Sequence, residues 1–162
     1  ASLQKASELE PSNPFYYWRL ADAYLYEENS GGAQKAYREA IRLKPDYIRA
    51  YIDYSEYFAR NEEFEKAVYV FEPIFENIQD NPDVLYTLGA YVFNRNFEYD
   101  KEEAKKMWER VLVLEPGHAN TLFALGIYYN DMDKKNEAQE YFKRANDIDP
   151  DNEEIKKYLL SI

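Results

Sequence analysis

An alanine followed four residues later by a large aromatic residue recurs along the chain, and this period constrains the fold more than any other feature. The alanines are Ala33, Ala67, Ala104 and Ala138, which are separated by 34, 37 and 34 residues. The aromatic residues are Tyr37, Phe71, Trp108 and Phe142. A fixed period in this range indicates a repeat protein, in which each unit buries its apolar face only against its neighbours.

Prolines and small residues recur in the same register. Apolar runs end in a Leu-x-Pro or Ile-x-Pro phrase at Pro11, Pro45, Pro116 and Pro150, while Gln79 holds the corresponding place between them. Proline disfavours helix in the residue before it, so each phrase predicts a helix end. Upstream, two large residues are followed by a small one at Ala21, Ser55, Gly89 and Gly126. Small residues let two helices approach closely, and the aromatic rings fill the remaining space.

These positions resemble the tetratricopeptide repeat family, whose unit is a helix pair of about 34 residues. The resemblance implies an all-α fold, an α-solenoid of antiparallel helix pairs stacked in a right-handed superhelix. We expect one repeat domain over residues 1–162, with an outer helix of a partial unit (1–13), four units (14–47, 48–81, 82–118 and 119–152) and a capping helix (153–162). The expected inner helices are 15–28, 48–61, 83–95 and 119–132, and the expected outer helices are 31–43, 64–77, 101–114 and 135–148.

Two segments depart from the repeat. Pro73 lies inside the second outer helix, where it removes a backbone donor and crowds the carbonyl of Tyr69, and bulky Ile74 follows it. We expect a kink and looser stacking after this unit. The third unit has a three-residue insertion in its turn, which carries Phe97 and Tyr99. These rings either fold onto the adjacent helices or form a lip that extends the binding surface.

The first helix also lacks a partner. Leu3 and Leu9 lie at helical spacing, and no inner helix precedes them. We therefore interpret the start of the chain as truncated, with an end that frays first.

The charge of the chain excludes one class of partner. The net charge is -11, from 31 acidic and 20 basic residues, so nucleic acid would be repelled. No apolar run approaches the roughly 18 residues of a membrane span, so we expect no membrane insertion and a soluble chain. The cytoplasm is the favoured compartment, although the composition does not determine it. Cysteine is absent, which removes disulfides and thiolate nucleophiles.

The sequence offers no recognisable catalytic or cofactor motif. His118 is the one histidine and lies in a turn, where it has no candidate triad partner. Gly31-Gly32 lacks the Lys-Ser/Thr of a phosphate loop. Asp147, Asp149 and Asp151 have calcium-loop spacing, but Asn152 takes the glycine position, so we expect these acids to cap the last helix. We predict no enzyme activity, no catalytic residue, no metal and no cofactor.

The resemblance implies a concave groove lined by the inner helices. An apolar row stands at its fifth positions: Trp18, Ile52, Tyr86 and Phe123. The other predicted groove residues are Phe15, Asp22, Tyr26, Arg49, Glu56, Arg60, Ala90, Phe93, Asn94, Ile127 and Asn130. Co-chaperone members bind a C-terminal carboxylate with Lys and Asn where this chain has Trp18 and Asp22, so that clamp is missing.

These features predict a scaffold for protein–protein interaction. Its partner would be a protein or peptide segment with an apolar anchor, amphipathic and with basic flanks, because acidic residues surround the row. The row could instead pack helix against helix. The alternative function is self-assembly or intrachain packing within a larger protein, such as the regulatory arm of an enzyme. The sequence therefore leaves open whether the chain forms a homo-oligomer.

Overall fold

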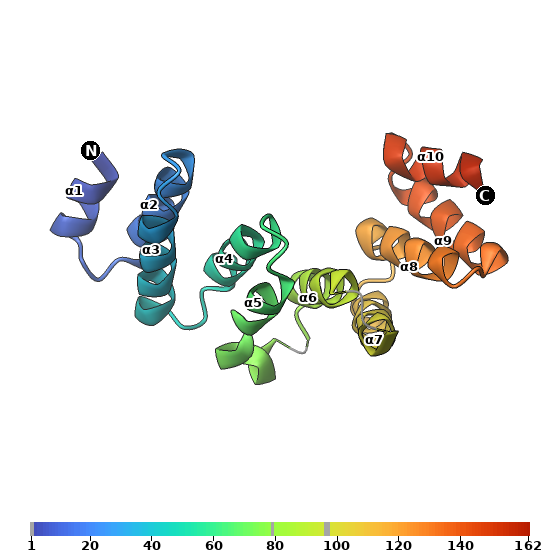
Figure 1. Ribbon diagram of the computed structural model, residues 1–162, viewed down its shortest axis with the longest axis horizontal. Helices are drawn as coiled ribbons and strands as arrows, with labels where there is room; N and C mark the ends of the chain where they lie inside the picture. Colours follow the sequence, from blue (N-terminus) through green and yellow to red (C-terminus); the bar gives the residue numbers. More distant parts are fainter. Residues whose placement is uncertain (1, 79, 96–97) are drawn as a thin grey trace. The chain divides into compact units, whose positions relative to one another are not determined.

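The computed structural model describes residues 2–78, 80–95 and 98–162, and this part of the chain is helical without any strand (Figure 1). The helices are α1 (Ser2–Leu9), α2 (Pro14–Tyr26), α3 (Ser30–Leu43), α4 (Ile48–Ala59), α5 (Phe64–Tyr69), the 3-10 helix η1 (Glu72–Asn77), α6 (Pro82–Asn94), α7 (Glu98–Leu114), α8 (Ala119–Asp131), α9 (Lys135–Ile148) and α10 (Glu153–Ser161). The predicted all-α fold is confirmed, and most helix bounds agree within one turn.

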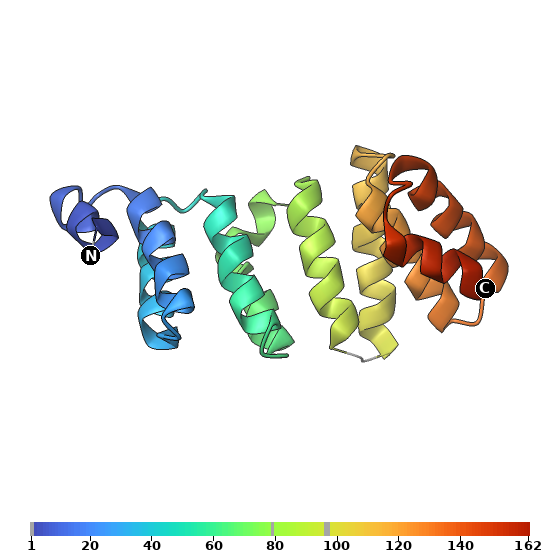
Figure 2. The ribbon, with the colours of Figure 1, turned by 90° about the horizontal axis from the view of Figure 1, so that it is seen from above.

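The chain divides into two compact units, Ala1–Phe75 and Glu76–Ile162. From here on they are called the first and the second unit, and the four predicted helix-pair units are called repeats. In the first unit, α2 packs against α3 and α4 packs against α5. In the second unit, α6 packs against α7, α8 packs against α9, and α10 covers α9 (Figure 2). Each pair is therefore a helical hairpin of the kind that the repeat predicts, while a single domain over the whole chain stays a prediction.

Asparagine side chains cap the N-termini of several of these helices. The Oδ1 of Asn13, Asn29 and Asn81 accepts a hydrogen bond from the backbone N–H of Phe15 (3.1 Å), Gly32 (2.9 Å) and Val84 (3.1 Å), respectively. Such a cap satisfies a helix N–H that has no partner within the helix.

The last helix, α10, is capped in the same way. Asn152 Oδ1 accepts from the backbone N–H of Glu154 at 3.1 Å, while Asp149 itself accepts from Asn152 Nδ2. The prediction that the neighbouring aspartates cap this helix was therefore wrong, because Asn152 already lies at the position from which a side chain reaches the first free N–H groups.

The small residues of the repeat lie where an aromatic ring meets the helix backbone. A Cβ atom on Gly89 would lie 2.5 Å from Nε1 of Trp108, and one on Gly126 would clash with Phe142. Ala21 and Ala33 are fully buried. The expected close approach of paired helices is therefore confirmed.

The second outer helix is interrupted rather than kinked. The last α-type hydrogen bond of α5 runs from Val70 N to Lys66 O, and Phe71 N then bonds to Val68 O with the shorter 3-10 spacing. Pro73 lies two residues further on, in η1, and has no N–H to continue the α pattern. The prediction of one helix over 64–77 was therefore wrong, because a continuous helix needs that donor.

The insertion of the third repeat is partly helical, since α7 begins at Glu98. Phe97 and Gln79 lie outside the described residues, and the side chain of Tyr99 is also outside them, so the two interpretations of these rings stay predictions. Beside the insertion, Arg95 donates to both carboxylate oxygens of buried Asp100, at 3.0 and 2.7 Å. This ion pair fixes the end of α6 to the start of α7.

Candidate interaction site on α2 and α4

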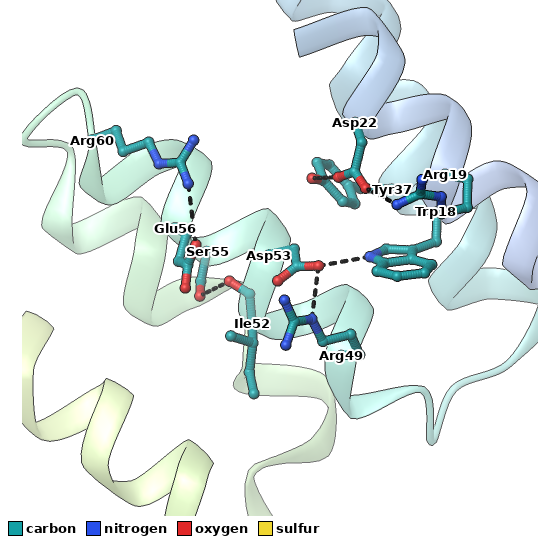
Figure 3. Close-up of polar contacts among 10 residues, drawn as sticks. All are labelled: Trp18, Arg19, Asp22, Tyr37, Arg49, Ile52, Asp53, Ser55, Glu56 and Arg60. Carbon is teal, nitrogen blue, oxygen red and sulfur yellow. Dashed lines mark hydrogen bonds and ion pairs between the residues drawn. The ribbon is translucent and has the colours of Figure 1, made fainter. Parts of the chain in front are cut away.

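A hollow of about 260 Å³ opens on the face formed by α2 and α4, in the first unit (Figure 3). We call it the polar hollow. Five of the predicted groove residues line it: Trp18, Asp22, Arg49, Glu56 and Arg60. The other lining residues are Arg19, Leu25, Tyr37, Asp53 and Tyr57. The structure thus brings together side chains of both inner helices around one space.

Asp53 connects the two helices and was missed by the sequence analysis. Its Oδ2 accepts from the indole Nε1 of Trp18 at 2.7 Å and from Nε of Arg49 at 3.0 Å (Figure 3). A partly buried indole N–H needs an acceptor, and this one comes from the neighbouring helix pair. Trp18 therefore braces α2 against α4 with a fixed ring orientation, instead of lying as a free apolar anchor.

Tyr37 forms the second polar contact at the base of the hollow. Its hydroxyl donates to Asp22 Oδ1 at 3.0 Å, while the ring is fully buried. Burial raises the pKa of Tyr37 far above its ordinary value, and the nearby charge of Asp22 raises it further. Both effects keep this hydroxyl a neutral donor to the carboxylate.

Three ion pairs surround the hollow, each along a single helix. They join Arg19 to Asp22 (3.4 Å), Arg49 to Asp53 (3.0 Å) and Arg60 to Glu56 (3.4 Å). In every pair the arginine side chain is the more exposed member: 49% against 37%, 65% against 12% and 74% against 46%. The carboxylates therefore lie deeper than the arginines.

The remaining predicted groove residues of the first unit differ in exposure. Tyr26 is 93% exposed and Phe15 is 48% exposed. The Phe15 ring lies 5.5 Å from that of Trp18, so it extends the aromatic edge of the polar hollow. Ile52 is half-buried on α4. Accessible aromatic surface therefore lies beside the charged groups.

In the second unit, the predicted aromatic residues take part in helix packing. The Phe123 ring lies 5.5 Å from Phe142 and 5.3 Å from Tyr158 of α10. Tyr86 contacts the ring of His118, which caps α8 by accepting from Thr121 N. Phe93 packs on Trp108 at 5.5 Å. These rings are half-buried, so each offers one edge at most to a partner.

The remaining predicted groove residues of the second unit differ in exposure. Asn94 is exposed, whereas Ala90, Ile127 and Asn130 are half-buried. The side chain of Asn94 donates to the carbonyl of Ala90 at 2.7 Å, and Asn130 accepts from Lys135 at 2.7 Å. Their role as partner-binding residues stays a prediction.

Within residues 2–78, 80–95 and 98–162, no group of three or more His, Cys, Asp or Glu side chains is arranged to hold a metal ion. No helix in the same ranges has the length and apolar character that a membrane crossing requires.

Two parts of the chain match models of one known family. Two family models, each described as a tetratricopeptide repeat, match residues 19–76 and 119–152, which together make up more than half of the chain. The second match coincides with the fourth predicted repeat, residues 119–152. The chain belongs to the tetratricopeptide repeat family. Nine of the ten residues that line the polar hollow lie within residues 19–76, which the first model covers, and Trp18 immediately precedes them. The family as a whole provides scaffolds for protein interaction.

Similar tetratricopeptide structures share the fold at low identity. A crystal structure of MamA is 17% identical, with a TM-score of 0.74, and the match covers 90% of this chain and 78% of that one. PilW, a type IV pilus biogenesis factor, is 18% identical with a TM-score of 0.76 over 98% and 76% of the two chains. YrrB, a TPR protein with an unusual peptide-binding site, is 19% identical with a TM-score of 0.73 over 99% and 80%. These similarities establish the fold.

One curated relative is an enzyme. The human protein O-mannosyl-transferase TMTC3 is 29% identical over 119 residues, which are 73% of this chain. The chain spans only 13% of that protein. The shared segment thus accounts for a small part of the length of the transferase.

Proposed function

We propose that this tetratricopeptide chain is a scaffold that binds a protein or peptide segment, and that the polar hollow is one of its contact points. The observation that carries the proposal is the arrangement of charge there: each carboxylate is less exposed than the arginine with which it pairs. We propose no catalytic role for it, and the small share of TMTC3 that the chain matches carries no activity to this chain.

The arrangement favours a partner with basic side chains. Exposed ion pairs along one helix stabilise a protein by only about 0.3–0.5 kcal/mol each, so an incoming Lys or Arg can displace the arginine side chains at low cost. Its charge would then meet Asp22, Asp53 and Glu56, of which Asp53 is the least exposed at 12% and therefore the least screened by water. The net charge of -11 also accelerates the approach of a basic segment.

An apolar anchor fits beside the charged groups. The half-exposed ring of Phe15 adjoins Trp18, whose orientation is fixed by Asp53. A preorganised aromatic edge loses little conformational entropy when a partner binds. We therefore propose that the partner is an amphipathic segment with basic flanks, whose apolar side contacts Phe15 and Trp18.

The test uses a capped amphipathic peptide of leucine and lysine, titrated by fluorescence anisotropy. The double variant Asp22→Asn/Glu56→Gln removes two charges from the polar hollow while keeping hydrogen-bond acceptors. Its matched control, Glu27→Gln/Glu28→Gln, removes two charges from exposed residues that do not line the hollow. We expect the first variant to weaken binding about tenfold, since hydrogen bonds to charged groups contribute about 1.5–3 kcal/mol, and the control to change it little.

Equal losses in the two variants would show that only the general charge of the chain acts, and the proposed site would be abandoned. The same would follow if neither variant changed the affinity. Sedimentation of the free protein distinguishes the self-assembly alternative, because a dimer that forms with rising concentration and excludes the peptide would replace the scaffold interpretation.

A further inference from the structure

An apolar pocket of about 330 Å³ lies on the other side of α4, between the two outer helices of the first unit. We call it the outer pocket. Its walls are Ile41 and Arg38 of α3, Tyr51, Tyr54 and Phe58 of α4, and Lys66, Tyr69, Val70 and Pro73 of the α5–η1 segment. It shares no lining residue with the polar hollow.

The pocket exists where the second outer helix stops early. The helix α5 ends at Tyr69, because Pro73 prevents its continuation, whereas the other outer helix, α3, continues to Leu43. After Tyr69 the chain therefore departs from the axis of α5. The ring of Tyr69 is 70% exposed beside the opening, while Tyr51 and Val70 form buried walls. Large aromatic and aliphatic surface therefore borders a space that no described side chain fills.

Arg38 supplies a charge at this pocket without a carboxylate to match it. Its Nε donates to the hydroxyl of Tyr54 at 3.1 Å, and within the described part of the chain its guanidinium makes no ion pair. One turn further along α3, Arg42 is held by Glu39 through bonds of 2.9 and 2.6 Å. Lys66, the other cation of the pocket, is paired with Glu63 at 2.9 Å. Arg38 thus keeps planar donors available for a carboxylate.

We propose that the outer pocket is a second docking site, which takes a bulky apolar side chain of a partner protein segment that carries a carboxylate beside it. The apolar side chain enters between Tyr51, Val70 and Tyr69, and the carboxylate bonds to the free edge of Arg38. The pocket volume lies at the low end of the range for small-ligand sites, which suits one or two side chains. The site is separate from the polar hollow and selects the opposite charge.

The probe is the capped peptide acetyl-Gly-Glu-Phe-Gly-amide, titrated into the full chain and followed by NMR chemical-shift changes. Two matched peptides replace its glutamate by lysine or its phenylalanine by serine. The variants are Arg38→Gln and Tyr69→Ala, both at exposed side chains, and the control is Arg42→Gln on the same helix. We expect saturable shifts at Tyr51, Tyr54 and Val70, about tenfold weaker binding in Arg38→Gln, and unchanged binding in Arg42→Gln.

Several results would overturn the proposal. These are equal binding of the glutamate and lysine peptides, equal loss in Arg38→Gln and Arg42→Gln, unchanged binding in Tyr69→Ala, shifts confined to α2, or no saturable binding by the glutamate peptide. The variant Asp22→Asn/Glu56→Gln should retain the site. If the proposal for the polar hollow fails its own test, the proposal for the outer pocket is therefore unaffected, and the reverse also holds.

Discussion

Gly126 lies where α8 meets the ring of Phe142 from α9, and its replacement by alanine tests how closely the paired helices pack. An ideal Cβ atom at Gly126 would overlap three ring carbons, of which Cζ is the most distant at 2.9 Å. The ring of Phe142 is fully buried. It also packs on Phe123 at 5.5 Å and on Tyr158 at 5.2 Å, so it cannot withdraw without moving both.

The expected magnitude is the difference between two opposing effects. Alanine is about 1 kcal/mol more favourable than glycine inside a helix. Overpacking a core costs about 1–3 kcal/mol, and the contact at Gly126 belongs at the upper end because the obstacle is a buried ring. We therefore expect Gly126→Ala to lower the free energy of unfolding by about 2 kcal/mol.

Urea denaturation followed by circular dichroism measures this change, and hydrogen exchange assigns it to α8 and α9. Gly31→Ala is the matched control, because Gly31 lies in the first turn of α3 and a Cβ there would meet nothing within 4 Å. It should raise stability by up to about 1 kcal/mol. A Gly126→Ala protein as stable as the wild type would refute the argument from close packing.

Three further changes test other parts of the fold. Pro73→Ala should lower stability by about 0.5–1 kcal/mol, because Pro73 is the second residue of the 3-10 helix η1, where its fixed φ fits, and because it restricts the unfolded chain. A gain in a urea titration would mean that α5 extends instead. Arg95→Ala should cost about 2 kcal/mol in the same assay by leaving the acceptor oxygens of buried Asp100 unpaired, whereas no loss would show that water replaces the arginine. Burial, followed by a hydrogen bond to Glu102, raises the pKa of Tyr128 from 10.0 to about 12. The stability that its neutral hydroxyl provides is therefore complete below pH 10 and is lost as the pH rises toward 12, so wild type should lose stability relative to Tyr128→Phe in that range.

The repeat could be predicted because its period reports contacts inside each helix pair. Ala33 and Tyr37 recur as Ala138 and Phe142, and in all four cases the residue is buried. Every helix hairpin of this kind needs a small side chain at the alanine position and a large ring four residues later, whatever partner it binds. The pattern is therefore visible in a single sequence. The end of α5 was only partly predictable. The sequence indicates that Pro73 disturbs the helix, but it does not distinguish a bend from a change to 3-10 geometry, in which Ile74 is buried.

The polar hollow was less predictable, because its central contact joins residues 35 positions apart. Asp53 looks like an ordinary surface acid that pairs with Arg49 one turn earlier on the same helix. One signal was available: Trp18 carries an N–H group that needs an acceptor, and Asp53 was a candidate one repeat away. The half-burial of Phe123 was harder to foresee, since it depends on Tyr158 of α10 lying against its ring.

The polar hollow and the outer pocket differ in chemistry because inner and outer helices expose different parts of the repeat. On α2 and α4, each arginine has an acid on its own helix, so the face is neutral in sum and its deeper layer is negative. Between α3 and α5, the early end of one helix exposes apolar walls, and Arg38 keeps a charge that its own helix does not match. A basic amphipathic segment would thus find carboxylates at the polar hollow and repulsion at the outer pocket, so the two surfaces could hold different partners at the same time.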